Sequence, residues 1–449
     1  MIVMKFGGTS VGSPERIRSV VNLVNDDKPK IVVLSAMSGT TNALVKISEL
    51  FYAGNKSAVA EIDQLEDKYK VVVSELYGTE EYRNRGTGLI RERFDLLRSF
   101  SRRPFTAVDE CTILAQGELL STALTRLYCE ESGIASMLLP ALNFMRIDRN
   151  GEPDSYYIKE QINRELESCP DVKLFITQGF ICRDANGEIS NLKRGGSDYS
   201  ASLIGKAINA EEIQIWTDID GFHNNDPRYV KNTKAIRELS FSEAAELAYF
   251  GAKILHPACV WPAQEANIPL LLKNTMEPEA PGTVISSKAV DEGIKAIAAK
   301  DNITAIKIKS GRMLMAYGFL RKVFEVFESY RTPIDMITTS EIAVSLTIDS
   351  TVHLDKIIQE LQLYGNVGID RRMTIICIVG NNIMNSKESI AKIFKALKNV
   401  PVRMISYGGS RHNISILTDS EYKAEALNRL SEYLFMDEHR SRHKRHSSD

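Results

Sequence analysis

The chain has 449 residues, of which 43% are hydrophobic and 25% charged, and this composition is close to the average for globular proteins. It excludes disordered, collagen-like and disulfide-scaffold classes, and the length suggests roughly three domains of about 150 residues. The formal net charge of -2 gives no general attraction to nucleic acid or to an anionic membrane. We therefore expect a small-molecule partner.

The six cysteines are scattered without a C-x-x-C pair, which argues against a zinc cage or a redox motif and favours reduced thiols. The N-terminal segment from Met1 reaches Lys5 and two glycines at once, so it lacks the apolar core of a secretory signal. No uncharged run is long and apolar enough to span a bilayer. These features predict a soluble cytoplasmic protein.

Over the first two thirds, short β-branched runs alternate with helical patterns, as in βαβ units around a mostly parallel sheet. Ser13-Pro14-Glu15 predicts a helix start, because it supplies an N-cap, a proline at the first helical position and an acidic first turn. Ser240 and Glu243 form a capping-box pattern before a helix over Ala244–Phe250. The predicted strands are Ile2–Phe6, Ile31–Leu34, Leu174–Gln178, Ile213–Trp216 and Ile268–Leu272.

Two glycine pairs follow predicted strands and suggest anion-binding turns. Lys5 precedes Gly7 and Gly8, which let backbone N–H groups approach a phosphate while the lysine supplies charge; an ordinary glycine turn is the alternative. Arg194 precedes a second pair, ahead of a helix with Ser197 or Asp198 as the predicted N-cap. Two such turns suggest a charged substrate facing a nucleotide.

Three further segments are ambiguous on spacing alone. Glu118 is expected early in a helix, where it could simply complement the helix dipole. The segments 216–221 and 225–228 contain Asp-Gly and Asp-Pro steps that are more often plain turns. Lys253 follows a predicted helix, where a lysine usually interacts with the C-terminal dipole. We find no Ser/His/Asp or Cys/His nucleophile pattern and no metal-ligand spacing.

After the turn-rich segment 277–282 the sequence pattern changes to shorter predicted strands and helices, and we place the main domain boundary near Lys288. The remainder contains a repeat: Pro333–Ile337 and Ser345–Asp349 are echoed by Pro401–Ile405 and Ser415–Asp419. A predicted amphipathic helix precedes each copy, over 319–330 and 389–397. Two related β/α modules and a solvated basic tail are therefore expected.

Seven motifs in order resemble those of aspartate kinases: KFGGTSVG (5–12), SAMSGTTN (35–42), QGE (116–118), KRGGSDYSA (193–201), WTDIDG (216–221), NDPR (225–228) and FGAKILHP (250–257). The tail is similar to the paired ACT modules of that family, and most similar to its monofunctional, lysine-sensitive branch. The resemblance covers the chain to about Phe435.

The resemblance implies an α/β fold: an amino-acid-kinase three-layer αβα sandwich over 1–288, then ferredoxin-like ACT modules over 301–370 and 371–438. Strand 294–300 would pair into the second module, and 439–449 would be a disordered tail. The implied reaction transfers the γ-phosphoryl group of ATP, with Mg²⁺, to the β-carboxylate of L-aspartate. This is the first step of the lysine, threonine and methionine (diaminopimelate) pathway.

Motif by motif, the resemblance also assigns roles. Lys5, Gly7 and Gly8 would neutralise the β- and γ-phosphates, and Asp198 would organise that network. The substrate would contact Ser35, Thr41, Glu118, Arg194 and Ser197, with Glu118 facing its ammonium and Arg194 its α-carboxylate. The nucleotide site would include Thr217, Asp218, His223, Arg228, Lys253 and Ile254; relatives often have tyrosine where His223 stands.

An amino-acid effector needs acidic partners, and only the first module offers them, since Arg403 stands in the second at the place of Asp335. We therefore expect one effector pocket per chain, for L-lysine rather than threonine. Its residues would be Met313, Gly318, Phe319, Leu320, Asp335, Thr339, Ser340 and Glu341. Exposed strand edges predict a homodimer through the ACT modules, with a tetramer as the alternative.

Two other functions remain open. Another amino-acid kinase, such as a glutamate-type enzyme, would share much of the motif set. A non-catalytic amino-acid sensor would keep the effector module, although the joint presence of Lys5, Arg194, Asp198 and Lys253 argues against lost catalysis.

Overall fold

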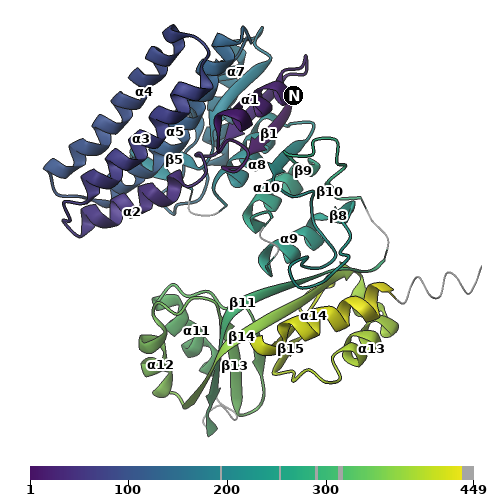
Figure 1. The fold of residues 1–449 in the computed structure, drawn as a ribbon. Coiled ribbons are helices and arrows are strands. Elements are labelled where there is room, and N and C mark those ends of the chain that lie inside the picture. The colour runs from purple at the N-terminus through teal and green to yellow at the C-terminus, as the bar shows by residue number, and fades with distance from the viewer. Residues whose placement is uncertain (193–194, 252–253, 289–291, 312–316, 437–449) are drawn as a thin grey trace, which may run out of the picture. The chain divides into compact units, whose positions relative to one another are not determined.

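The structure, a computed structural model, describes residues 1–449 except 193–194, 252–253, 289–291, 312–316 and 437–449 (Figure 1). The chain folds into two compact units. The first comprises Met1–Phe222, Arg237–Phe241 and Ile254–Lys288, and the second His223–Ile236, Ser242–Lys253 and Ala289–Asp449. Two segments that precede residue 288 thus pack with the C-terminal unit.

The first unit is built on an eight-stranded sheet in the order β3-β4-β2-β1-β7-β9-β10-β8. All neighbours in it run parallel except β9 and β10. Its strands are β1 (Ile2–Phe6), β2 (Lys30–Leu34), β3 (Met137–Leu138), β4 (Leu174–Gln178), β7 (Ile213–Thr217), β8 (Glu238–Ser240), β9 (Leu270–Asn274) and β10 (Thr283–Ser286); β5 (Ile181–Arg183) and β6 (Ile189–Asn191) form a separate hairpin.

The helices of this unit include three long ones, α3, α4 and α5, which lie side by side (Figure 1). The helices are α1 (Pro14–Val24), α2 (Thr40–Tyr52), α3 (Ala58–Leu76), α4 (Glu80–Ser99), α5 (Ala107–Glu131), α6 (Ala141–Phe144), α7 (Ser155–Glu167), α8 (Gly196–Ile208) and α10 (Val260–Glu265).

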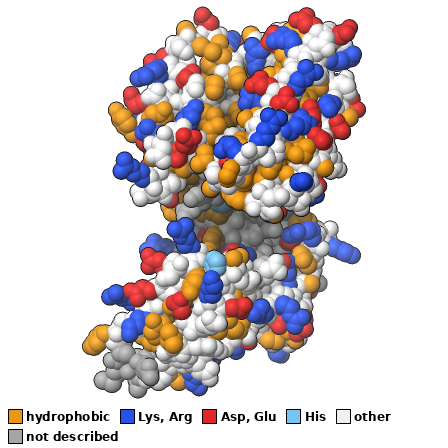
Figure 2. Space-filling view, turned by 90° about the vertical axis from the view of Figure 1, so that its left-hand side faces the viewer, with side chains coloured by type: hydrophobic (Ala, Val, Ile, Leu, Met, Phe, Trp, Pro, Cys, Tyr) orange, Lys and Arg blue, Asp and Glu red, His pale blue; other side chains and the backbone are white. Residues whose placement is uncertain are grey.

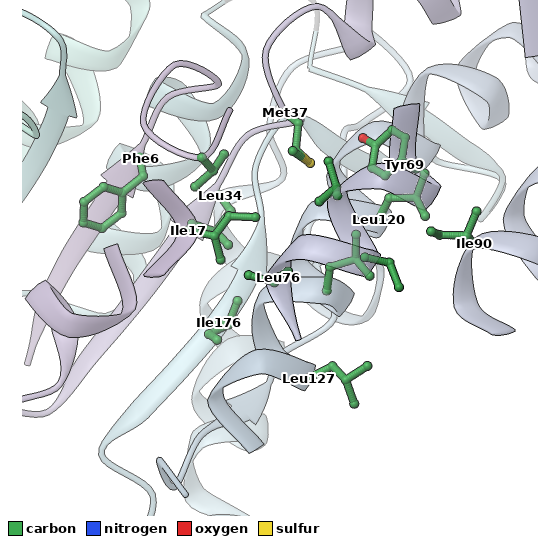
Figure 3. Packing of buried hydrophobic residues seen from close by; sticks show 14 of the residues in the cluster. Phe6, Ile17, Leu34, Met37, Tyr69, Leu76, Ile90, Leu120, Leu127 and Ile176 are labelled. Atoms are coloured by element: carbon green, nitrogen blue, oxygen red, sulfur yellow. The ribbon is translucent and has the colours of Figure 1, made fainter. Parts of the chain in front are cut away.

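The core of the first unit joins sheet and helices. Phe6 and Leu34 of the strands are fully buried together with Ile17 of α1 and Leu120 of α5 (Figure 3). Burial of each such side chain contributes about 1.5–3 kcal/mol. The expected helix start is confirmed, because the Ser13 side chain accepts a hydrogen bond from the Arg16 N–H.

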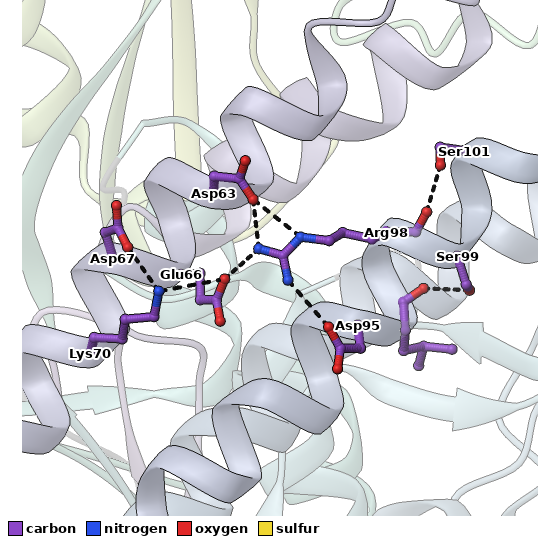
Figure 4. Close-up of polar contacts among 9 residues, drawn as sticks. Asp63, Glu66, Asp67, Lys70, Asp95, Arg98, Ser99 and Ser101 are labelled. Atoms are coloured by element: carbon purple, nitrogen blue, oxygen red, sulfur yellow. Dashed lines mark hydrogen bonds and ion pairs between the residues drawn. The ribbon is translucent and has the colours of Figure 1, made fainter.

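A polar cluster links α3 and α4 at the surface (Figure 4). The Arg98 guanidinium of α4 donates to Asp63, at 2.5 Å, and to Glu66 of α3. These two carboxylates hold the pKa of Arg98 above its usual value. Asp63 is exposed, so its ion pair with Arg98 contributes little to stability, whereas the Glu66 side chain is only 11% exposed.

The second unit is organised around two long antiparallel strands, β11 (Gly293–Lys309) and β14 (Asn366–Asn381). They form the middle of a sheet with the order β12-β13-β11-β14-β16-β15. The other elements are α9 (Phe241–Tyr249), α11 (Phe319–Ser329), β12 (Ile337–Thr339), β13 (Ala343–Ile348), α12 (Leu354–Gln362), α13 (Lys387–Ala396), β15 (Met404–Ser406), β16 (Asn413–Asp419) and α14 (Lys423–Ser431).

The predicted repeat is visible as two equivalent hairpins. β12 pairs with β13 on one side of the long strands, and β15 pairs with β16 on the other. Each hairpin belongs to a separate apolar core: Val344 and Leu346 pack with α11 and α12, while Ile414 and Ile416 pack with α13 and α14.

The strand predictions for β1 and β4 are confirmed residue for residue, and those for β2 and β7 to within one residue. The fifth was wrong by two residues, because β9 spans Leu270–Asn274 and Ile268 lies between the preceding turn and the strand. Among the described residues, no helix combines the length and apolar character needed to cross a bilayer. Basic and acidic side chains are interspersed on the face shown in Figure 2.

Candidate active site

The carboxyl ends of the parallel strands β4, β2, β1 and β7 lie along one edge of the sheet of the first unit. The loops that leave this edge carry Gly179, Ser35, Gly7 and Asp218. Ligands in α/β proteins bind at this edge, because the loops and helix N-termini converge there. The sequence motifs for substrate and nucleotide therefore start from neighbouring strands.

A cavity of about 360 Å³ opens at this edge. It brings together four of the predicted substrate residues, Ser35, Thr41, Glu118 and Ser197, with Gly8 of the first glycine pair. The remaining lining comes from Ala36, Met37, Ser38, Gly39, Asn42, Phe180 and Gly196. Hydroxyls, a carboxylate and backbone N–H groups in one small polar cavity suit a small zwitterion.

Lys5 and Asp198 form an ion pair in which the Lys5 Nζ lies 2.7 Å from the Asp198 Oδ1. Their side chains are only 12% and 15% exposed, so the pair is shielded from bulk water. The pair holds the ammonium beside Gly7, where an added Cβ would lie 3.5 Å from the Lys5 Nζ. The lysine is thus aimed at the glycine turn before any anion binds.

Two glycines make the walls of the cavity possible. A Cβ at Gly8 would lie 2.8 Å from the carbonyl oxygen of Ala36, and a Cβ at Gly117 would lie 2.7 Å from the Ala36 Cβ. Both distances are below van der Waals contact, so α5 and the glycine turn approach the 35–42 loop only because these side chains are absent.

Glu118 points into this cavity from the middle of α5. The expectation of an early helical position is wrong, because α5 begins at Ala107 with a capping box formed by Thr106 and Asp109. The Glu118 Oε1 accepts from the Ala36 N–H at 3.1 Å, while the Oε2 is buried without a hydrogen-bond partner among the described residues. Burial raises the pKa of Glu118 to about 7. Such a carboxylate is poised to receive a cation.

The helix after the second glycine pair starts earlier than expected. α8 begins at Gly196, and Gly195 is its N-cap with φ +69°, so the prediction of Ser197 or Asp198 as N-cap is wrong. Glycine adopts this left-handed conformation without strain and frees Ser197 and Asp198 to face the site. Arg194 lies outside the described residues.

The predicted nucleotide residues divide between the two units. Thr217 ends β7 in the first unit and Asp218 follows it, next to the point where the Gly7 N–H donates to the Trp216 carbonyl at 3.3 Å. His223 and Arg228 lie on the 223–236 segment of the second unit. Ile254 lies in the first unit, and Lys253 lies outside the described residues.

The predicted effector residue Asp335 has partners that we did not predict. Its Oδ1 accepts from the Tyr249 hydroxyl at 2.9 Å and from the Lys300 Nζ at 2.7 Å, and its side chain is 2% exposed. Its Oδ2 is buried without a hydrogen-bond partner among the described residues. Gly318 caps α11, which Phe319 and Leu320 begin; Thr339, Ser340 and Glu341 are exposed, and Met313 lies outside the described residues.

The most informative residues missed from the sequence are Gly179 and Phe180. Phe180 lines the cavity with φ +64°, a strained value for a non-glycine residue, and its N–H donates to the Ser200 hydroxyl at 2.8 Å. The available signal was position, since the pair directly follows the carboxyl end of a predicted strand. In the parts of the chain that the structure describes, no three His, Cys, Asp or Glu side chains gather as a metal site.

Comparisons with known proteins identify the family of this chain. The model of the amino acid kinase family matches residues 1–274, and an ACT-domain model matches residues 376–434. The lysine-sensitive aspartokinase 3 of Escherichia coli is 32% identical over 97% of this chain and 99% of its own length. The chloroplastic aspartokinase 3 of Arabidopsis thaliana is 34% identical over 96% of this chain and 81% of its own length.

Solved structures agree. Escherichia coli aspartokinase III in complex with aspartate and ADP has a TM-score of 0.86 at 31% identity, covering 97% of this chain and all of that one. The same enzyme in complex with lysine and aspartate has a TM-score of 0.81 at 32% identity, covering 97% of this chain and 99% of that one. The expected fold class, an amino-acid-kinase domain followed by ACT structure, is confirmed. The chain therefore belongs to the aspartokinases, ATP-dependent phosphotransferases of the amino acid kinase family.

Proposed function

We propose that this enzyme transfers the γ-phosphoryl group of ATP to the β-carboxylate of L-aspartate, giving 4-phospho-L-aspartate and ADP. The observation that carries the proposal is the polar cavity in which Ser35, Thr41, Glu118 and Ser197 meet beside the Lys5–Asp198 pair. The product enters the pathway to lysine, threonine and methionine. We keep the division at 1–288, 301–370 and 371–438 as a proposal for the sequence modules, although 223–236 and 242–253 belong to the same compact unit as the ACT modules.

The chemistry needs positioning more than acid–base catalysis. A carboxylate with a pKa near ~4 is already ionised at neutral pH, so its oxygen attacks the γ-phosphorus without a general base. The bond from the γ-phosphorus to the bridging oxygen breaks, and ADP carries away the electron pair. Lys5 neutralises the phosphates, and the glycine turn lets them approach the main chain closely.

The remaining site residues bind or orient the aspartate and the nucleotide. The Glu118 carboxylate receives the substrate ammonium, Arg194 the α-carboxylate, and Ser35, Thr41 and Ser197 the reacting end. Thr217, Asp218, His223, Arg228, Lys253 and Ile254 hold the nucleotide. Mg²⁺ enters with ATP: the described residues offer no dedicated cage, which suits an ion that keeps its waters and binds substrate phosphates.

The test is ADP release by the purified protein with MgATP and L-aspartate, with L-glutamate in parallel. We expect turnover with aspartate only, and a loss of about 10²-fold or more in kcat for Lys5→Met. Lys70→Met is the matched control, since that lysine is an exposed residue of α3 paired with Asp67. Turnover with glutamate alone would identify the other kinase, and activity of Lys5→Met equal to wild type would overturn the site.

We further propose that L-lysine inhibits the enzyme at the first ACT module. The buried Asp335 Oδ2 has no partner among the described residues and could receive an ammonium, while the backbone N–H groups at Gly318–Leu320 would donate to the α-carboxylate. Lys300 already neutralises part of the Asp335 charge, so Met313, Thr339, Ser340 and Glu341 would have to complete the pocket.

Asp335→Asn should abolish inhibition by L-lysine without changing turnover in its absence, because the amide keeps the shape but loses the charge. Asp355→Asn on α12, an exposed acid of the same module, should leave inhibition intact. Steady-state inhibition curves decide, and unchanged inhibition of Asp335→Asn would contradict the assignment.

Assembly and location complete the proposal. The edge strands β12 and β15 carry partly exposed Ile337 and Ile405, which would be covered in a homodimer joined through the ACT modules. Light scattering distinguishes this dimer from a monomer or a tetramer. No cysteine of the described residues forms a disulfide, which suits a reducing cytoplasm, and neither nucleic acid nor membrane is among the proposed partners.

A further inference from the structure

The segment 223–236 connects two strands of the first unit, yet its own packing is with the second ACT module. Val230 is 4% exposed and belongs to an apolar core with Ile297, Leu427 and Leu430. The Ile297 N–H also donates to the Asn224 carbonyl at 3.0 Å. The segment therefore has no separate core of its own and takes its conformation from that module.

Helix α14 is hydrogen-bonded to this segment at two points, once to its main chain and once to a side chain. The Asn428 Nδ2 donates to the Tyr229 carbonyl at 3.0 Å and to the Ala424 carbonyl at 2.8 Å. In return, the Asn225 Nδ2 donates to the Leu427 carbonyl at 3.2 Å. Asn225 is 2% exposed, so this bond is formed away from water.

A buried cation strengthens the contact. The Lys423 Nζ lies 4.1 Å from the centre of the Tyr229 ring and 2.5 Å from the Asp301 Oδ2. The Lys423 side chain is 7% exposed, and a cation over an aromatic ring gains most when it is desolvated. Lys423 and Asn428 thus hold the same residue of the segment, one at its ring and the other at its carbonyl.

From Asn225, which is bonded to α14, further hydrogen bonds lead to Arg228. The Asn225 Oδ1 accepts from the Asp226 N–H at 2.8 Å, and the Asp226 carboxylate accepts from the Arg228 Nε at 3.0 Å and Nη2 at 2.7 Å. The Arg228 side chain is nevertheless 75% exposed. A guanidinium oriented by a carboxylate, with its outer face free to solvent, is arranged to meet an anion.

We propose that the second ACT module is a scaffold for nucleotide binding, with Lys423 and Asn428 of α14 as positioning residues for the segment that carries His223 and Arg228. This inference rests on the nucleotide role given to that segment above. It also gives the second module a task that does not require an effector, in keeping with Arg403 at the place of Asp335.

The test is calorimetric titration of the full-length protein with MgADP, in wild type, Asn428→Ala and Lys423→Met. We expect each variant to weaken MgADP binding roughly 3- to 10-fold, the equivalent of one lost hydrogen bond or cation–π contact. The KM for aspartate should not change, and thermal unfolding should show that the fold is intact. A general structural defect would instead weaken the binding of both MgADP and aspartate.

Arg429→Ala is the matched control on the same helix, because its side chain pairs with Glu425 four residues away. It should bind MgADP as wild type does. Equal MgADP affinity in Asn428→Ala and Lys423→Met, with weakened binding in Arg228→Ala, would overturn the scaffold while leaving the nucleotide site in place. Unchanged affinity in Arg228→Ala would overturn both assignments, and since no aspartate is present, it would not bear on the phosphate acceptor.

Discussion

Glu118 is a buried carboxylate whose charge the empty protein barely supports. Among the described residues, its Oε1 accepts from one backbone N–H, its Oε2 has no partner, and Lys5 alone lies near enough to favour the anion through space. In the substrate complex that we propose, the ammonium of the amino acid would supply the missing partner. Binding should then lower the pKa of Glu118 and release a proton near neutral pH.

This carboxylate should make the empty protein less stable as the pH rises. The pKa is about 7 in the folded protein and about 4.5 for the free group, so the folded state binds more protons between these values. The stabilisation is complete below pH ~4.5 and falls by about 3 kcal/mol as the pH rises through ~7. Glu118→Gln should abolish this part of the pH dependence.

Urea unfolding at pH 5 and pH 8, without substrate, measures the difference for wild type and Glu118→Gln. A loss of stability that is identical in the two proteins would mean that other groups cause it. Aspartate added at pH 8 should restore more stability to wild type than to the variant, since only the carboxylate gains a charged partner.

At the scale of helices and strands, the close approach of α5 to the 35–42 loop is the feature that forms the cavity. Gly117 sits at the contact, whereas Gly88 on α4 has nothing within 4 Å of an added Cβ. Two glycines in neighbouring helices thus have opposite requirements. Comparing them separates the stability lost through a steric clash from the stability gained when alanine replaces a glycine in a helix.

Gly117→Ala should destabilise the protein by about 1–3 kcal/mol and raise the KM for aspartate, because α5 must move away from Ala36. Gly88→Ala should instead stabilise it by about 0.5–1 kcal/mol, through helix propensity alone. Denaturant unfolding and steady-state kinetics of both variants provide the check. An aspartate KM that is unchanged in Gly117→Ala would show that the contact does not shape the substrate site.

Local signals in the sequence predicted the ends of β1, β2, β4 and β7 to within one residue and the helix start at Ser13, because β-branched runs and N-caps act over a few residues. They failed where geometry depends on a backbone angle or on distant partners. Nothing local shows that Gly195 adopts a left-handed conformation and caps α8. The Thr106–Asp109 capping box, which sets Glu118 in the middle of α5, was present in the sequence and overlooked.

At the scale of the whole chain, the boundary near residue 288 and the compact units differ. Residues 223–236 and most of α9 precede that boundary but pack with the C-terminal unit. Glu246 of α9 accepts from Asn413 of β16, and Glu243 pairs with Lys295 of β11 at 3.2 Å. Only long-range packing shows that these segments belong to the C-terminal unit, so no local sequence pattern could have predicted it.

A fragment ending at residue 288 should therefore be poorly folded. It would expose Val230 and leave Glu243, which is fully buried in the intact chain, without Lys295. We expect strong binding of an apolar dye, broad thermal unfolding and no measurable affinity for MgADP. A monomeric fragment with sharp unfolding and wild-type MgADP affinity would contradict the division into units.

The pairing of β11 with β14, which runs through both modules, constrains how the C-terminal third of the chain can vary. Gly293–Lys300 of β11 pairs with Ile375–Asn381 of β14 in one module, and Ile303–Lys309 pairs with Asn366–Met373 in the other. β11 and β14 each contribute one half of their length to each module. A recombination crossover between the repeats would therefore disrupt at least one module. Recombination, natural or in the laboratory, should yield functional chimeras only when residues 293–381 are inherited as one block.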